Sequence, residues 1–249
     1  MCCFSRPVEF VMATRIFARF VDAERQAVVY SMRLGASQEL AMILPIPVAQ
    51  PAREDALKFV DLSGYPHLFR SFEAGFPRPA ARASVDSLSG GGAEPLEVVE
   101  VGSFVASFVP TVADFGRLDE RFRLSPGAWE KLGDYSRHGF AVFQLKPGRV
   151  RIHPMAFTFP TSRLGQLFFP TVHVHDEKVH RTAKFDHILY CQLGRGGQRA
   201  VASWAESDLP AGRFVEVPKT KGLVDGDRHI FRLPMVGRLL NADILLAAA

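Results

Sequence analysis

Apolar and polar residues alternate along much of this chain, and this period of two predicts β-strands. Residues 25–34 alternate well enough for a half-buried strand, whereas residues 8–21 alternate more loosely. Residues 39–48 form a continuous apolar run that suits an inner strand. Further strand-like or partly loop-like segments follow at residues 96–109, 140–145, 150–159, 167–175, 179–193, 204–217 and 229–240.

Helical spacing of apolar residues is rarer and predicts only short helices. Residues 53–62 separate apolar from charged side chains as an amphipathic helix does, and residues 65–76 are a second candidate. A third helix is expected over residues 125–137, with Ser125 as the N-cap and Pro126 in the first turn. Together with the strands, these segments indicate a mixed composition in which β-structure dominates.

The elements therefore predict an α+β fold class: a β-dominated, twisted, mostly antiparallel sheet with two or three short helices. The chain of 249 residues is expected to form a single domain, residues 1–249. Residues 77–95 are rich in Pro, Ala, Ser and Gly, and we expect them to be a mobile loop or linker within it. The 21 Phe residues supply ample apolar area for a core.

The charge of the chain argues against several classes of partner. The formal net charge is +4, and the 30 Lys and Arg residues are spread along the sequence rather than gathered in a basic stripe, so we expect no nucleic-acid partner. No run approaches the ~20 apolar residues of a membrane span. As written, the N-terminus lacks the pattern of a secretion signal, which predicts a cytoplasmic protein unless the start is processed. The partner is then an unidentified small molecule or protein.

Three of the eight histidines lie within eight residues, at His173, His175 and His180. If residues 176–177 form a two-residue turn, strand alternation places all three imidazoles on one face of a hairpin, while His187 falls on the opposite face. Three converging imidazoles with an open position suit copper or zinc, and iron less well. The pattern therefore predicts a metal site, with an incidental surface cluster as the alternative.

Two of the three cysteines stand at the start of the chain, as Cys2 and Cys3. Either would add a thiolate ligand if the N-terminus returned to the histidines, and a thiolate favours zinc or copper. Removal of the initiator methionine would instead expose Cys2 with a free α-amino group, which can activate its own side chain as a nucleophile. Cys2 and Glu177 are thus the candidate catalytic residues, and plain burial is the alternative for both cysteines.

Several short motifs follow one another in a characteristic order: CCFSRPV, TRIFARF, YSMRLGASQELAMILPIPVAQP, LEVVEVGSF and IHPMAFTFPTSRLGQLFFP. In this order they resemble an uncharacterised bacterial family, domain-of-unknown-function family 2330, whose members begin with a CGGFF-like motif and carry a strand ending in FxWVxPVP. The resemblance covers about residues 2–190 and implies no established activity. Members usually follow a secretion signal and lack the histidine cluster, so the family does not explain these histidines.

The leading hypothesis from the sequence is a soluble metal-binding protein in which His173, His175 and His180 hold copper or zinc, with Cys2 or Cys3 as a further ligand. If it is an enzyme, the metal would act as a Lewis acid or redox centre. The first alternative is a non-enzymatic binding or interaction module that engages a partner through its Phe-rich β surface and the segment 77–95. The second alternative is an amide hydrolase that uses Cys2 as an N-terminal nucleophile.

Overall fold

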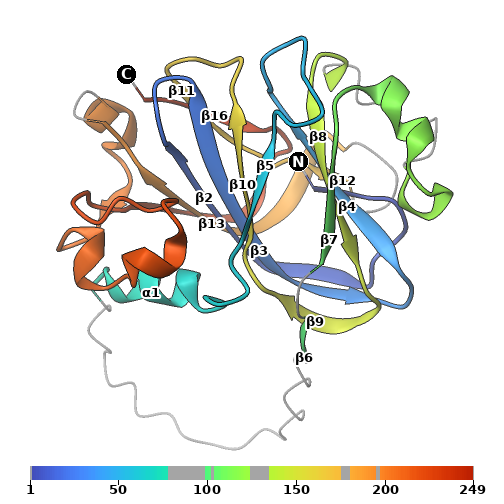
Figure 1. Ribbon diagram of the computed structural model, residues 1–249. Coiled ribbons are helices and arrows are strands. Elements are labelled where there is room, and N and C mark those ends of the chain that lie inside the picture. The colour runs from blue at the N-terminus through green and yellow to red at the C-terminus, as the bar shows by residue number, and fades with distance from the viewer. Residues whose placement is uncertain are drawn as a thin grey trace, which may run out of the picture.

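A computed structural model of the protein describes residues 2–77, 99–101, 104–123, 135–174, 180–194 and 197–248. Most of this part of the chain is strand, arranged in two large sheets, and few helices accompany it (Figure 1). Most strand pairs are antiparallel. The expectation of a β-dominated α+β fold is confirmed at this level. Among the described residues, no helix has both the length and the apolar character that crossing a membrane requires.

The smaller sheet has five strands in the order β12-β1-β4-β8-β7 and lies on the right of Figure 1. The N-terminal strand β1 is parallel to β12 and antiparallel to β4. It therefore sits between two neighbours rather than at an edge. The bounds are β1 Cys2–Phe4, β4 Leu40–Ile46, β7 Val105–Val109, β8 Gly139–Leu145 and β12 His173–Val174.

The larger sheet has nine strands, seven of them in the order β14-β15-β13-β2-β3-β10-β5, and β9 joins β3 to β6. β2 and β13 run parallel, as do β6 and β9. A separate pair joins β11 to β16. The bounds are β2 Phe10–Phe20, β3 Arg25–Ala36, β5 Lys58–Asp61, β6 Val99–Val101, β9 Gly148–Ile152, β10 Met155–Pro160, β11 Gln166–Phe169, β13 Thr182–Gln192, β14 Ala205–Glu206, β15 Phe231–Leu240 and β16 Ile244–Ala247.

Strand β4 shows how the apolar pattern builds the core between the two sheets. Its even-numbered residues, among them Leu40 and Leu44, join a cluster with residues of the larger sheet, whereas Ala41 and Ile43 point to the other face. That other face is also covered, by Phe115 and Phe122 from two 3-10 turns. Both faces of β4 are therefore buried, which explains why its sequence is continuously apolar rather than alternating.

The outer face of the larger sheet is covered by helix α1, Leu68–Ala74, which lies at the lower left of Figure 1. Its apolar residues Leu68, Phe69 and Phe72 occupy one side of the helix and are buried against this face, together with Phe17 and Tyr190. The helix lies inside the segment 65–76 for which we predicted a helix. The 3-10 turns are η1 Val112–Arg117, η2 Glu120–Phe122, η4 Gly197–Val201, η5 Ala211–Arg213 and η6 Val217–Thr220.

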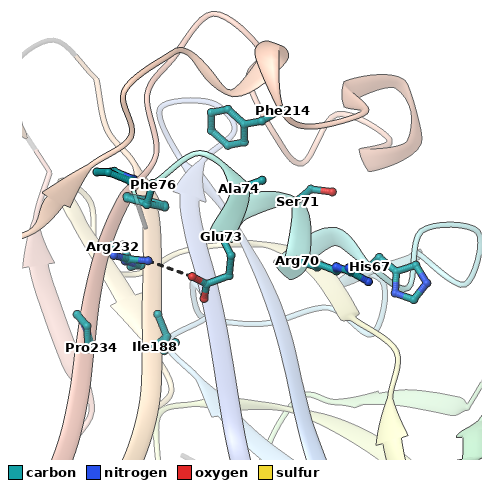
Figure 2. Close-up of a pocket in the computed structure, with 11 residues that line it drawn as sticks. His67, Arg70, Ser71, Glu73, Ala74, Phe76, Ile188, Phe214, Arg232 and Pro234 are labelled. Carbon is teal, nitrogen blue, oxygen red and sulfur yellow. Dashed lines mark hydrogen bonds and ion pairs between the residues drawn. The ribbon is translucent and has the colours of Figure 1, made fainter. Parts of the chain in front are cut away.

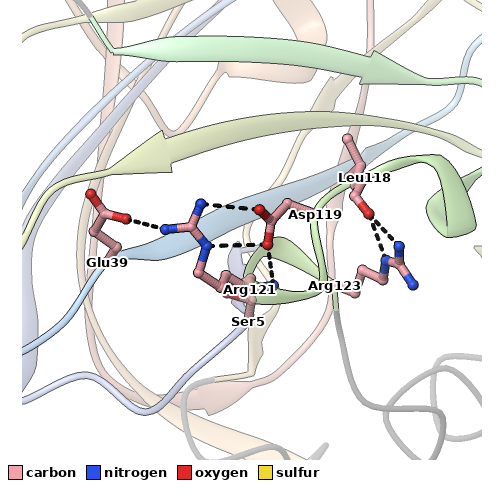
Figure 3. A network of polar contacts seen from close by, with 6 residues as sticks. All are labelled: Ser5, Glu39, Leu118, Asp119, Arg121 and Arg123. Atoms are coloured by element: carbon pink, nitrogen blue, oxygen red, sulfur yellow. Dashed lines mark hydrogen bonds and ion pairs between the residues drawn. The ribbon is translucent and has the colours of Figure 1, made fainter.

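Polar contacts attach the segment after β1 to turn η2 (Figure 3). The Ser5 hydroxyl donates to the carbonyl of Arg121 and accepts from the backbone N–H of Ala41, each at 2.9 Å. The guanidinium of Arg121 donates to the carboxylates of Asp119 and Glu39. The hydrogen bonds from Arg121 lower the pKa of Asp119 to about 2. The chain start is thereby fixed to a segment more than a hundred residues away.

Some local predictions were wrong. Residues 58–61 form strand β5 rather than part of a helix over 53–62, because they pair with β10, with Phe59 opposite Phe157. The successive segments 140–145 and 150–159, with a Pro-Gly turn between them, predict a hairpin, but β8 joins the smaller sheet whereas β9 and β10 join the larger. The helix expected over 125–137 and the segment 77–95 fall almost wholly outside the described residues.

Candidate functional site

The histidine region is built differently from the hairpin that the sequence predicted. His173 lies in β12, which pairs with β1, whereas β13 pairs with β2 and β15. The side chain of Asn241 binds the backbone of both His173 and His180. Its oxygen accepts from the His173 N–H at 2.7 Å, and its amide nitrogen donates to the carbonyls of His173 and His180 at 2.9 and 3.0 Å. His175 and Glu177 lie outside the described residues.

The imidazole that meets His173 is that of His187, not that of His180. The Nε2 atoms of His173 and His187 lie 2.9 Å apart, and both rings pack against Phe185. Nδ1 of His187 is 3.7 Å from a carboxylate oxygen of Asp186, within ion-pair range but too long for a hydrogen bond. His187 is almost fully buried, and this burial lowers its pKa, although the Asp186 carboxylate opposes the shift.

The metal-binding hypothesis is wrong. In the described part of the chain, no group of three or more His, Cys, Asp or Glu side chains is placed so that it could hold a metal ion. The copper or zinc site formed by His173, His175 and His180 depended on a bend at residues 176–177 that pairs β12 with β13, and the two strands instead belong to different sheets. His180 is exposed and lines, together with His173, an open cavity of about 370 Å³.

The cysteines do not form a reactive group in the described part of the chain. Cys3 is fully buried, in register with Ile43 of β4 and Val174 of β12. Cys191 is also a buried free thiol, and burial raises its pKa. The backbone of Cys2 pairs with His173, but its side chain lies outside the described part. Nucleophilic catalysis by Cys2 therefore stays a prediction.

A second site, which the sequence did not indicate, lies under helix α1. Strand register places Arg15, Ile188 and Pro234 side by side on β2, β13 and β15. Residues in such a row point to the same face of a sheet. Ile188 and Pro234 border a cavity of about 910 Å³, roofed by the end of α1 with Phe76 and by Phe214 (Figure 2). Arg15 lines a neighbouring cavity of about 300 Å³.

Glu73 joins the helix to the sheet at the centre of this site. It points from α1 toward Arg232 of β15, whose Nη1 donates to it at 3.0 Å (Figure 2). The hydroxyl of Tyr190 donates to its other oxygen, and Arg15 lies 4.0 Å away. Burial raises the pKa of Tyr190, with the Glu73 carboxylate as a further cause, so Tyr190 stays a neutral hydrogen-bond donor.

Aromatic contacts hold Arg232, which lines the same cavity, and the end of α1 in place. The guanidinium of Arg232 stacks over the ring of Phe76, 4.3 Å from its centroid. Gly75, at the end of α1, allows a close approach: a Cβ there would lie 2.3 Å from the ring of Phe214. No pattern in the sequence pointed to this site, because its residues come from α1, a loop and otherwise ordinary strands that only the tertiary structure brings together.

Comparisons with known proteins show a fold and no family. No protein-family model and no curated protein matches this sequence. The crystal structure of baculovirus P35 matches 99% of this chain and 99% of its own length, with a TM-score of 0.52 and 11% sequence identity. A structure of a mutated baculovirus P35 after caspase cleavage matches 95% of this chain, with a TM-score of 0.51 and 12% identity.

At these identities the likeness shows that the two proteins share the fold, and nothing more. It has no bearing on the resemblance to domain-of-unknown-function family 2330, which stays a prediction.

Proposed function

We propose that this chain is a non-enzymatic binding protein whose partner is a protein, and that this partner is a cysteine protease of the caspase type. The observation that carries the proposal is the match of the whole chain to baculovirus P35, one of whose structures was determined after caspase cleavage. The proposal replaces the metal-dependent enzyme with the interaction module that the sequence offered as its first alternative.

Exposed apolar side chains on the described surface support a protein partner. Val236 and Leu240 of β15 are 71% and 63% exposed, and Leu239 and Leu245 are also exposed. Among the described strands, β15 pairs with β13 alone beyond its short pairing with β14 at residues 231–232. Apolar side chains on a strand of this kind are typical of surfaces that contact another protein.

Purified full-length protein incubated with a panel of caspases tests the proposal. We expect a complex on size-exclusion chromatography, a chain cut after an aspartate as identified by mass spectrometry, and reduced hydrolysis of a fluorogenic aspartyl peptide. A chain that stays intact and unbound with every caspase, and leaves peptide hydrolysis unchanged, would sink the proposal.

Two variants locate the cut. Asp86 is the aspartate in the segment 77–95, which we expected from the sequence to engage a partner. Asp208 is an exposed aspartate of the described part and serves as the matched control. We expect the Asp86→Ala variant to resist cleavage and the Asp208→Ala variant to be cut like the wild type. A cut that persists in Asp86→Ala at the same bond would contradict a contact through this segment.

A further inference from the structure

Two cavities adjoin along α1, and together they are called the groove beneath α1. The first, of about 910 Å³, and the second, of about 300 Å³, share His67, Arg70 and Glu73. The first extends toward Arg232 on β15 and the second toward Arg15 on β2. Glu73 therefore stands where the two cavities adjoin, pointing from α1 toward the larger sheet (Figure 2).

Positive charge exceeds negative charge in this groove. Its lining holds three guanidinium groups, from Arg15, Arg70 and Arg232, and one carboxylate, from Glu73. Arg232 binds Glu73 directly and Arg15 is at the 4.0 Å limit of an ion pair. Arg70 is exposed and has no ion pair within the part of the chain that the structure describes. One carboxylate thus cannot satisfy the three cations.

Donor groups of these arginines also remain without acceptors. The Nε atoms of Arg15 and Arg232 are buried and have no hydrogen-bond partner among the described residues. These two atoms are out of reach of a ligand, but the side chains of Arg15 and Arg232 are still 33% and 24% exposed, so other donors of each guanidinium can meet an acceptor. A guanidinium presents its donors in a planar fork that matches a carboxylate. The groove is therefore prepared to accept further carboxylate oxygens.

Apolar side chains in the rest of the lining, beside the polar Ser31, His67 and Ser71, suit a peptide. Ile188, Pro234 and Phe214 border the larger cavity, beside the cationic side chains. A free phosphate would use the guanidinium groups but gain nothing from these walls, whereas a peptide with acidic and apolar side chains would use both.

We propose that the groove beneath α1 binds an acidic peptide segment of another protein, with carboxylates at Arg15 and Arg70 and an apolar side chain against Ile188 and Pro234. This site does not depend on the caspase proposal, because no feature of a protease enters the argument. Its failure and the failure of that proposal are therefore separate results.

Fluorescence anisotropy with the full-length protein tests the site. The probe is a fluorescein-labelled peptide of sequence Ala-Leu-Glu-Asp-Leu-Glu-Ala, and its Gln/Asn analogue is the uncharged comparison. We expect saturable binding of the acidic peptide, weakened by added salt, and no saturable binding of the analogue. Equal binding of both peptides, or of neither, would overturn the proposal.

Charge reversal at an exposed arginine distinguishes binding in the groove from a general effect of the net charge of the protein. We expect Arg70→Glu to weaken binding of the acidic peptide by about tenfold. The matched control is Arg163→Glu, which changes the net charge equally at an exposed arginine outside both cavities. Loss of affinity to the same extent in both variants would contradict the site. So would displacement of the peptide by an equal concentration of inorganic phosphate, which would indicate a simple anion site.

Discussion

His173 and His187 share a hydrogen bond between their Nε2 atoms, 2.9 Å apart, although they belong to different sheets. One of these nitrogens must carry the proton. The Asp186 carboxylate near Nδ1 of His187 favours a proton at that nitrogen, so we assign His173 as the Nε2–H donor and His187 as the acceptor. The pair therefore joins β12, which holds the N-terminal strand, to the centre of the larger sheet.

This pair predicts a stability that depends on pH near neutrality. Burial lowers the pKa of His187, so the unfolded chain binds a proton at a pH at which the folded chain does not. Stability is therefore complete above the unfolded histidine pKa of about 6.5 and falls as the pH drops below it, down to the lower pKa of the folded state. Urea denaturation at pH 8, 7, 6 and 5 measures this.

The matched variants for that experiment are His187→Gln and His67→Gln. His67 is exposed on the surface, so its replacement should leave the pH dependence between 7 and 5 as it is in the wild type. His187→Gln should flatten it. A wild type whose unfolding free energy is constant over this range would show that His187 titrates alike in both states.

Glu73 is predicted to be the main polar link between α1 and the sheet. Glu73→Ala removes the acceptor of Tyr190 and Arg232 and leaves a largely buried hydroxyl without that partner. We expect a loss of about 1–3 kcal/mol in the free energy of unfolding, measured by urea denaturation. Glu216→Ala, which removes a surface pair with Lys219, should change it little. Equal effects of the two variants would contradict the role of Glu73.

We predict that a glycine is required at position 75 because the ring of Phe214 lies too close for a Cβ, and not because of the backbone angles. The φ of Gly75 is −78°, which other residues adopt, but a Cβ would come within 2.3 Å of the half-buried ring of Phe214. Gly75→Ala should therefore cost about 1 kcal/mol as Phe214 shifts. Gly64→Ala, where a Cβ meets nothing within 4 Å, is the control and should be nearly neutral in thermal unfolding. A neutral Gly75→Ala would show that Phe214 moves freely.

Cys191 is predicted to be unreactive in the folded protein. Its thiol is buried and its pKa is raised, so almost no thiolate is available at pH 8. Labelling with a thiol reagent followed by peptide mapping should modify Cys191 only after denaturant is added. Modification of Cys191 in the native protein at the rate of a free thiol would show that β13 opens readily.

The sequence alone determined the longer strands and the class of fold, because both follow from local patterns, although it missed β5. Alternation revealed β2 and β3, and the unbroken apolar run of β4 indicated a strand buried on both faces. The apolar side of 65–76 likewise predicted α1. These features need only the neighbouring residues of the chain and a burying surface.

The tertiary structure alone decided which strands are neighbours, and with them every site. His173 meets His187, and Arg15 lies in a row with Ile188 and Pro234, through pairings such as β2 with β13 that join segments about 170 residues apart. A period of two tells which residues share a face of one strand, but it carries no information about the partner strand. For that reason the predicted metal hairpin failed, while the groove beneath α1 left no trace in the sequence.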